Sequence, residues 1–455
     1  MMNLPLHFKK PISWIGLILM WPVMLQAAAP EAPEPLERSR ALSMAVSGHP
    51  RMRVYAHRHD QAMERITQAR SGFLPQLSFS ERYSQTNNPM WAFGTMLNQE
   101  SITQNDFDPA RLNDPDGIDN FVGSFSVQWP LFDSGRTWYG WRQARQGAEV
   151  SELDMEKTKQ QVVAGAAVAY DSLLLATAHS QVIDQAMLLA EAHLRMVTER
   201  FQAGFVVKSD LLRAQVRLAE LKQKRYAAQS RVAVAIAALN AAMGEPPHEN
   251  YEPSDDLVMT ACKSQVIEDW IHTALSKRPE LLQLDKQASI AEKEIAKQKA
   301  AHLPSLGLFG NYEINSESLD ESATNYTVGA MVQVNLFSGY RDVAKTREAR
   351  AALEEINAQR LDLVAHIEVQ ARQAYYEACS AKERIGVTEF AVSLAEENRR
   401  IVADRYKNGL LTIVELLDSE TALEEARINR YQALYDYRVA YVNLQLAAGL
   451  VPSDL

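Results

Sequence analysis

The sequence has few cysteines, no excess of basic residues and, beyond its first residues, no long apolar run. Cys262 and Cys379 are its two cysteines, which excludes a disulfide-rich scaffold and a CxxC metal site. The 57 acidic residues outnumber the 47 Lys and Arg residues, and the net charge of −10 argues against nucleic-acid binding. Because no later segment could span a bilayer as a helix, a place in a membrane would require a β-barrel.

Residues 1–29 have the layout of a secretory signal peptide. Lysines precede an apolar run from Ile12 to Leu25, and small alanines follow it. The run is shorter than the roughly 20 apolar residues that a spanning helix needs. We therefore predict export, with cleavage after Ala27 or Ala29. No cysteine lies near this site, which argues against a lipid anchor.

The rest of the chain is an internal duplication. FLPQL, which begins at Phe73, recurs as HLPSL from His302, an offset of 229 residues. RFQAG, which begins at Arg200, recurs as RYKNG from Arg405, an offset of 205 residues. The smaller second offset places about 24 extra residues in the first half, within residues 87–120.

The duplication predicts the division of the chain. We expect the first repeat over residues 30–244, a linker or equatorial segment over 245–264 and the second repeat over 265–455. Each repeat has the same predicted order: helix, strand, strand, very long helix, sharp turn and helix.

Four segments alternate apolar and polar residues with a period of two, which is typical of half-buried strands. They lie near residues 75–86, 121–132, 304–315 and 326–337. A membrane barrel needs about eight strands or more, so four strands per chain predict an oligomer. Three copies would supply twelve strands around a water-filled pore. A soluble sheet with one wet face is the alternative.

Long proline-free segments predict unusually long helices. They run from Ser134 to Phe201 and from Ser338 to Lys407. Shorter helices are expected over Leu36–Ser71 and Ser209–Met243, so that two half-length helices match one long helix. A long coiled coil, as in a soluble periplasmic adaptor or a filament, is the alternative, but such proteins lack paired amphipathic strands.

These features together resemble the TolC-like outer-membrane efflux family. The resemblance rests on the duplicated order, on FLPQL and HLPSL before strands, on PLFDSG and NLFSG after strands, and on the RFxxG and RYxxG turns. It implies a mainly α fold with a membrane β-barrel: a trimer with a 12-stranded barrel and a long periplasmic α-helical barrel. It implies an outer membrane of a Gram-negative bacterium, with contact to outer-membrane lipid.

The same resemblance implies the function and the partners. The chain would be the exit duct of a tripartite efflux pump, working with a periplasmic adaptor protein and an inner-membrane pump. The alternative, a close second in the same fold, is an outer-membrane component of a type I protein-secretion system. No pair of titratable groups suggests catalysis, and we expect neither an enzyme nor a cofactor.

Two turns are the candidate adaptor contacts. A glycine interrupts each long helical pattern, at Gly204 and Gly409, and signals a chain reversal. The resemblance places these turns at the periplasmic tip. The predicted contact residues are Gly204, Val206, Gly409 and Leu410.

Two charged ladders before these turns are the candidate gate. Glu191, Arg195 and Glu199 share one helix face, and Glu396, Arg400 and Asp404 repeat the pattern 205 residues later. An ordinary solvated salt-bridge ladder explains the pattern as well as a gate does. For the gate, Asp404 is the first candidate and Arg400 its expected partner.

Other polar groups give weaker indications. A disulfide between Cys262 and Cys379 is a hypothesis, set against two separate buried thiols. His57 and His59 favour a surface position rather than a metal site, because residues two apart point to different helix faces. The acidic loop that holds Asp114, Asp116 and Asp119 favours a solvated turn over a calcium site, because the spacing does not match an EF-hand.

Overall fold

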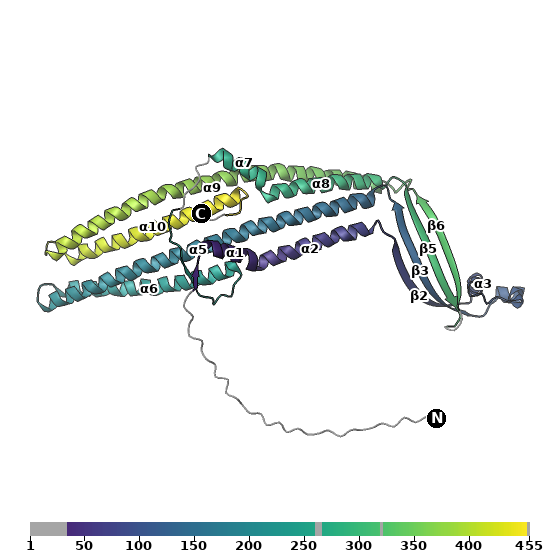
Figure 1. Ribbon diagram of the computed structural model, residues 1–455, viewed down its shortest axis with the longest axis horizontal. Coiled ribbons are helices and arrows are strands. Elements are labelled where there is room, and N and C mark those ends of the chain that lie inside the picture. Colours follow the sequence, from purple (N-terminus) through teal and green to yellow (C-terminus); the bar gives the residue numbers. More distant parts are fainter. Residues whose placement is uncertain (1–33, 260–265, 319–321, 453–455) are drawn as a thin grey trace, which may run out of the picture.

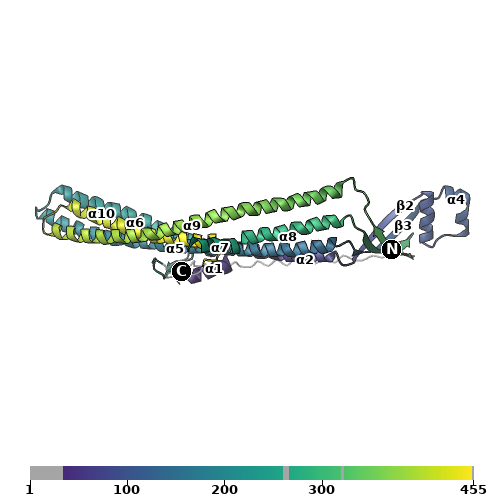
Figure 2. The same cartoon turned by 90° about the horizontal axis from the view of Figure 1, so that it is seen from above.

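The computed structural model describes residues 34–259, 266–318 and 322–452. The predicted signal peptide and Cys262 lie outside these residues. A long helical rod carries a small β-sheet at one end (Figures 1 and 2). In the first half the elements are β1 (Glu34–Leu36), α1 (Arg38–Gly48), α2 (Pro50–Ser71), β2 (Gln76–Thr86), α3 (Pro89–Asn98), η1 (Gln104–Phe107), α4 (Pro109–Asn113), β3 (Ile118–Phe132), α5 (Arg136–Gln202) and α6 (Lys208–Met243).

The second half repeats this order without the small helices between its strands. Its elements are β4 (Tyr251–Pro253), α7 (Ile267–Lys277), α8 (Pro279–Ala300), β5 (Ser305–Ser316), β6 (Ala323–Gln333), α9 (Arg341–Lys407) and α10 (Ile413–Ala447). The long helices α5 and α9 contain 67 residues each. At 1.5 Å per residue each is about 100 Å long, as the proline-free segments predict.

The helices form a single curved layer. On the side away from the sheet, α5 packs against α6 and α10, and α10 packs against α9. Nearer the sheet, α5 packs against α2 and α8, and α8 packs against α9. Thus α5 has neighbours on both flanks along its length, whereas α9 has neighbours on one flank (Figure 1).

The single helix predicted over Leu36–Ser71 is wrong, because the chain breaks between α1 and α2. His49 is extended, with φ −63° and ψ 127°, and Pro50 begins the next helix. A residue before proline avoids the helical region, so the sequence dictates this break. The second repeat has the same break at Arg278, before Pro279.

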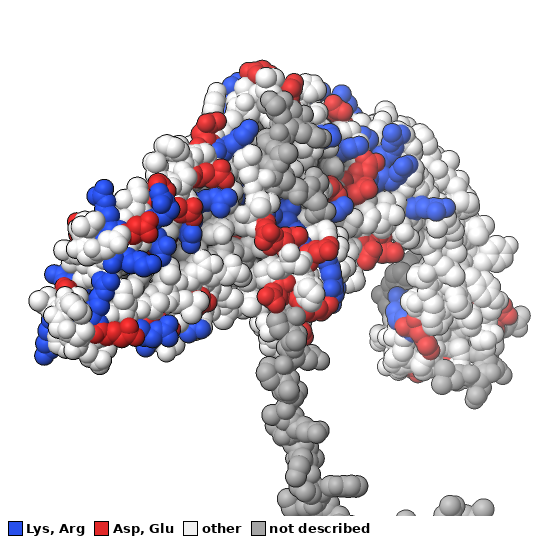
Figure 3. All heavy atoms as spheres, turned by 60° about the vertical axis from the view of Figure 1, so that its left-hand side comes forward, with Lys and Arg blue, Asp and Glu red and all other residues white. Residues whose placement is uncertain are grey.

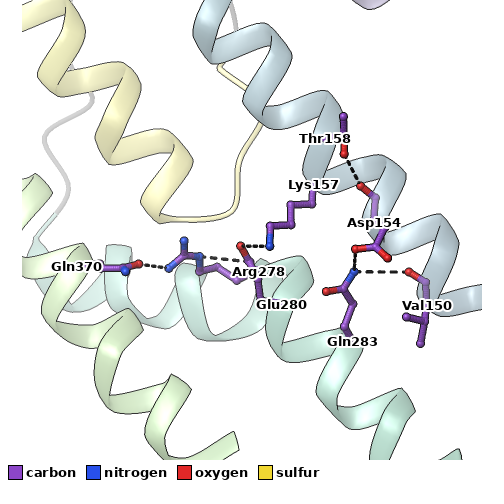
Figure 4. A network of polar contacts seen from close by, with 8 residues as sticks. All are labelled: Val150, Asp154, Lys157, Thr158, Arg278, Glu280, Gln283 and Gln370. Atoms are coloured by element: carbon purple, nitrogen blue, oxygen red, sulfur yellow. Dashed lines mark hydrogen bonds and ion pairs between the residues drawn. The ribbon is translucent and has the colours of Figure 1, made fainter. Parts of the chain in front are cut away.

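Polar contacts hold the second break against the long helices (Figure 4). The Arg278 guanidinium donates to the Gln370 side chain on α9 at 2.5 Å. Beside it, Lys157 on α5 lies 3.4 Å from the Glu280 carboxylate. Gln283 donates to the Asp154 carboxylate at 2.7 Å. These contacts join α8 to both 67-residue helices.

The sheet is antiparallel throughout, with the strand order β2-β3-β5-β6. The predicted fourth strand at 326–337 begins and ends earlier, at 323–333. β6 pairs with β5 only from Ala323 to Gln333, so the alternating residues after Gln333 have no partner strand on β5. Both outer strands, β2 and β6, have one free edge within the described chain.

The extra residues of the first repeat do not form a simple turn. They carry α3, η1 and α4 between β2 and β3, at the end of the sheet far from the rod (Figure 2). Asn88 caps α3, and its side chain accepts from the backbone N–H groups of Met90 and Trp91. The corresponding connection in the second repeat, between Ser316 and Ala323, is short.

The largest core lies halfway along the rod. Tyr170, Leu239 and Tyr437 are buried there, at the level of the parallel pair β1 and β4. The Tyr170 hydroxyl donates to the Leu36 carbonyl at 2.8 Å and to the Asp255 carboxylate at 2.6 Å. The segment after α6 is thereby fastened to the side of α5.

Candidate functional site

The tips of the two helical hairpins have the same backbone geometry. Gly204 has φ +79° and Gly409 has φ +75°, which is the left-handed region where glycine is favoured. The N–H of Phe205 donates to the Arg200 carbonyl at 2.8 Å, and the N–H of Leu410 donates to the Arg405 carbonyl at 2.9 Å. The predicted chain reversals are confirmed; their role in docking stays a prediction.

The side chains that point into solvent at the tips differ in part from those predicted. Leu410 is 71 % exposed, as a contact residue requires. Val206 instead packs against the core of the tip, while its neighbours Phe205 and Val207 are 81 % and 63 % exposed. Phe205 was not among the residues predicted from the sequence, although an aromatic residue directly after the reversal glycine is a recognisable signal.

A small core joins the two tips. Val197 and Ala214 of the first hairpin pack with Tyr406 and Leu416 of the second. The Arg200 guanidinium lies 5.2 Å from the centre of the Tyr406 ring. Burial raises the pKa of the Tyr406 hydroxyl above its ordinary value. The two hairpins therefore end in one packed unit.

The ladder of the second repeat is only partly as expected. Arg400 lies 3.7 Å from Asp404, but it makes two shorter hydrogen bonds, of 2.8 and 2.6 Å, to Glu397. Its hydrogen bonding lowers the pKa of the Glu397 carboxyl. Glu396 pairs with Arg427 on α10 at 2.8 Å. The expected partner pair is present, but Glu397 is the stronger partner.

The ladder of the first repeat is not linked in the same way. Among the described residues, none forms an ion pair with Glu191, Arg195 or Glu199. Glu199 and Arg195 are exposed. The charged residues of the two ladders have the same spacing but different contacts. The Arg400–Asp404 ion pair of the second repeat therefore has no counterpart between Arg195 and Glu199.

Two carboxylates between the hairpins, buried Glu424 and partly buried Glu420, were not predicted from the sequence. Glu424 on α10 is almost fully buried and contacts Arg217 at 2.5 Å and Lys224 at 2.6 Å, both on α6. Glu420, one turn earlier, contacts His193 on α5 at 2.6 Å. The signal was available: these glutamates follow Leu416 at intervals of four, on the buried stripe of α10.

The sheet has one apolar and one polar face. Paired across the strands, Phe79 and Phe125 lie on the apolar face with Tyr312. On the opposite face the Ser124 and Ser126 hydroxyls donate to the Asn311 side chain at 2.7 and 2.8 Å. Figure 3 shows many charged side chains over the rod and few over the sheet. This distribution suits a sheet with lipid on one side and water on the other.

The polar face is covered at its far end by the extra segment of the first repeat. Gln99, directly after α3, donates to the Asn120 side chain at 3.0 Å. Asn325 on β6 donates to the Asn98 carbonyl at 3.2 Å. The end of α3 therefore lies over the polar face of β3 and β6.

The remaining candidates show no shared site. Cys379 is exposed on α9, and the proposed disulfide cannot be followed because Cys262 lies outside the described residues. His57 is exposed and lies 3.3 Å from Asp60. Within the described ranges, no group of three or more His, Cys, Asp or Glu side chains is arranged to hold a metal ion.

Contrary to the expectation from the sequence, one described helix, α5, contains a window that is long and apolar enough to cross a membrane by length and composition. That window is 56 % buried inside the protein. The apolar stretch of α5 is therefore explained by its central place among the other helices.

An amphipathic four-stranded sheet on a rod of duplicated helical hairpins defines an outer-membrane channel subunit. The chain belongs to the outer membrane efflux protein family. The sequence pattern of that family matches residues 41–245 and 270–450 of this chain. It is an outer-membrane channel of a Gram-negative bacterium, for efflux or type I secretion.

Named relatives support this family. The chain is 26 % identical to the alkaline protease secretion protein AprF of Pseudomonas aeruginosa, over 90 % of this chain and 83 % of the relative. It is 22 % identical to the outer membrane protein TolC of Escherichia coli, over 88 % and 80 %. The crystal structure of the Campylobacter jejuni CmeC outer membrane channel has a TM-score of 0.75 at 16 % identity, over 90 % and 85 %.

Proposed function

We propose that three copies of this chain close into one exit duct, which passively conducts cargo out of the periplasm. Each copy contributes four strands to a twelve-stranded barrel and four helical positions to a periplasmic tunnel. The energy for export comes from an inner-membrane pump, joined through a periplasmic adaptor. An open four-stranded sheet with apolar side chains and two free edges needs such closure in a membrane.

One comparison between equivalent residues carries this proposal. Val182 on α5 and Val387 on α9 are 205 residues apart and occupy the same position in the two repeats. Val182 is 6 % exposed, whereas Val387 is 70 % exposed. Ala164 and Val369 show the same contrast, with 6 % and 64 %. A second copy that covers the free flank of α9 would remove this difference.

Disrupting that flank tests the assembly. We expect Val387→Asp to give monomers in detergent, because it would place a carboxylate in an apolar contact between copies. Lys382→Asp places a carboxylate at an exposed position on another face of α9, with a larger change in net charge (−2 against −1), and should leave the assembly intact. The measurement is mass by light scattering. A native chain that is monomeric in detergent, or a fully trimeric Val387→Asp variant, contradicts the proposal.

Protein secretion is the second candidate for the cargo. AprF of Pseudomonas aeruginosa and PrtF of Dickeya chrysanthemi, both matched over 90 % of this chain, are named as protease secretion proteins. TolC and the pyoverdine exporter OpmQ also match. Deletion of the gene would distinguish type I protein secretion from efflux. Loss of a secreted protein with unchanged drug sensitivity supports type I secretion, and the reverse result supports efflux.

The tip turns are proposed as the adaptor contacts, with Phe205 and Val207 added to Gly204, Gly409 and Leu410. Gly204→Pro or Gly409→Pro should abolish export and leave membrane insertion intact, because proline cannot adopt the left-handed turn. Export is measured in cells, and insertion by membrane fractionation. Normal export by both variants would contradict this role.

The closed end is proposed to depend on Arg400 and Asp404. Exposed pairs contribute only a few tenths of a kcal/mol to one chain, but a three-fold ring of carboxylates repels itself without the arginines. We expect Arg400→Ala with Asp404→Ala to raise single-channel conductance. The matched control is Arg195→Ala with Glu199→Ala in the first repeat. If the Arg400→Ala, Asp404→Ala variant has the conductance of the native protein and is blocked by cations to the same extent, the charged ladder has only a structural role.

A further inference from the structure

The end of α2 and the start of α5 lie near each other where the rod meets the sheet (Figure 1). An open groove lies between them. Its volume is about 420 Å³. It combines aromatic and aliphatic walls with basic side chains. The lining residues are Ile66, Thr67, Arg70 and Phe73 from the α2 side, and Trp138, Trp141 and Arg145 from α5.

The groove continues the apolar face of the sheet. Trp129 lies on that face of β3, two residues after Val127 and four after Phe125. Its indole N–H donates to the Phe73 carbonyl at 3.0 Å, and the Phe73 side chain lines the groove. Trp129 is 39 % exposed and Leu131 is 45 % exposed. An acyl chain lying on the sheet would therefore lead directly to the groove.

The charge at the groove is positive and not neutralised by the protein. The Arg142 guanidinium lies 4.8 Å from the centre of the Trp138 ring, and that of Arg145 lies 5.3 Å from the Trp141 ring. Within the described chain, no carboxylate forms an ion pair with Arg70, Arg142 or Arg145. Two nearby carboxylates have other partners.

The partners of these two acids lie on α8 and at the start of α5. Glu149, one turn beyond Arg145, is bound by Lys286 of α8 at 2.6 Å. Asp133 accepts from the Thr137 hydroxyl at 2.6 Å and caps the start of α5. The guanidinium groups are therefore available to an external anion, and the indole rings hold two of them in place.

From this geometry we infer that the groove binds the phosphate headgroup of an anionic phospholipid in the periplasmic leaflet of the outer membrane. Guanidinium groups bind phosphate oxygens well, and tryptophan and arginine at a membrane boundary suit the region between headgroup and acyl chain. This inference rests on the proposed function, in which the sheet is embedded in the membrane. The inference adds a specific lipid-binding site at the edge of that sheet.

The second repeat offers a matched control. At its equivalent positions, Lys299, Arg347 and Arg350 keep positive charge, but Val343 and Thr346 replace the two tryptophans. The chain therefore contains two basic junctions, of which one has the aromatic walls. Removing the same number of charges from each separates a defined site from general attraction to a charged surface.

Lipid retention by the full chain tests the inference. The native protein, Arg70→Gln with Arg145→Gln, and the control Lys299→Gln with Arg350→Gln would be placed in bilayers containing equal phosphatidylglycerol and phosphatidylcholine. Native mass spectrometry would then measure the lipid retained after extraction. We expect the native protein to retain phosphatidylglycerol preferentially, with about a fivefold loss for each arginine removed from the groove. The control should retain it as the native protein does.

Three outcomes would overturn the site: no preference for phosphatidylglycerol, equal losses in both double variants, or a crosslink from Trp138→Cys to a neighbouring copy that shows protein in the groove. Conductance in phosphatidylcholine bilayers is measured for the same variants. If the native protein conducts but shows no preference for phosphatidylglycerol, only the lipid site is rejected. If the native protein does not conduct at all, the proposed channel function is rejected.

Discussion

The hairpin of α5 and α6 and the hairpin of α9 and α10 share their backbone plan but differ in their side chains. Their long helices have the same length, and their tips turn through glycines with nearly equal φ angles. Yet buried Glu424 corresponds, 205 residues earlier, to Ala219, and the α10 capping box has no counterpart at α6. The duplication has therefore preserved the helix lengths and the tip turns. The side chains that join the two hairpins differ between the repeats.

The largest expected effect comes from removing the asymmetric buried charge. Glu424→Ala would leave buried Arg217 with only the more distant and exposed Glu220, 3.9 Å away, so we expect a loss of about 3 kcal/mol in the free energy of unfolding. Glu425→Ala, an exposed neighbour, should change it by less than about 0.5 kcal/mol. Urea unfolding of the detergent-solubilised protein measures both. Equal effects would show that the pair does not hold the hairpins together.

The tip glycines test the symmetric part of the comparison. Gly204→Ala and Gly409→Ala should each lower the free energy of unfolding by about 1–2 kcal/mol, because a side chain disfavours the left-handed backbone. Nothing crowds either position, so backbone strain is the only expected cause. Losses that differ by more than the experimental error would show that the two tips are not energetically equivalent.

The smallest effect concerns the helix starts. Hydrogen bonds from the backbone and hydroxyl of Thr412 lower the pKa of the Glu415 carboxyl. A lowered pKa in the folded state gives stability that is present above the ordinary carboxyl pKa and lost as the pH falls through the lowered value. Lowering the pH should therefore reduce the protection factors of the amides in the first turn of α10, that is, their exchange rates corrected for the intrinsic pH dependence of amide exchange.

The start of α6 is the internal reference for that measurement, since Val207 provides no side-chain cap. Glu415→Gln should remove the carboxyl titration from the exchange profile of α10. If low pH reduces the protection factors equally in the first turns of α6 and α10, the capping carboxylate is not the cause.

The sequence predicted regular features better than contacts between distant segments. Proline-free stretches and alternating residues located the long helices and the strands, because periodicity is a local property. Pro50 is also a local signal, because a proline disfavours the helical conformation of the residue before it. The prediction of one helix over Leu36–Ser71 did not use this signal. In contrast, the burial of Val182 and exposure of Val387 depend on neighbouring helices, which identical residue types do not reveal. Glu424 shows the same limit, since its partners lie some 200 residues away.

Two glycines at the ends of α6 and α10 set the mechanics of the rod. A Cβ on Gly244 would lie 2.7 Å from the Gly48 carbonyl carbon, and one on Gly449 would lie 2.8 Å from the Arg278 nitrogen. The half-length helices thus abut at the same two breaks, one in each repeat. Of the helices in the described ranges, only α5 and α9 cross this level without interruption. Because the half-length helices pack along them, α5 and α9 are the continuous elements through which a movement of the tips would reach the sheet.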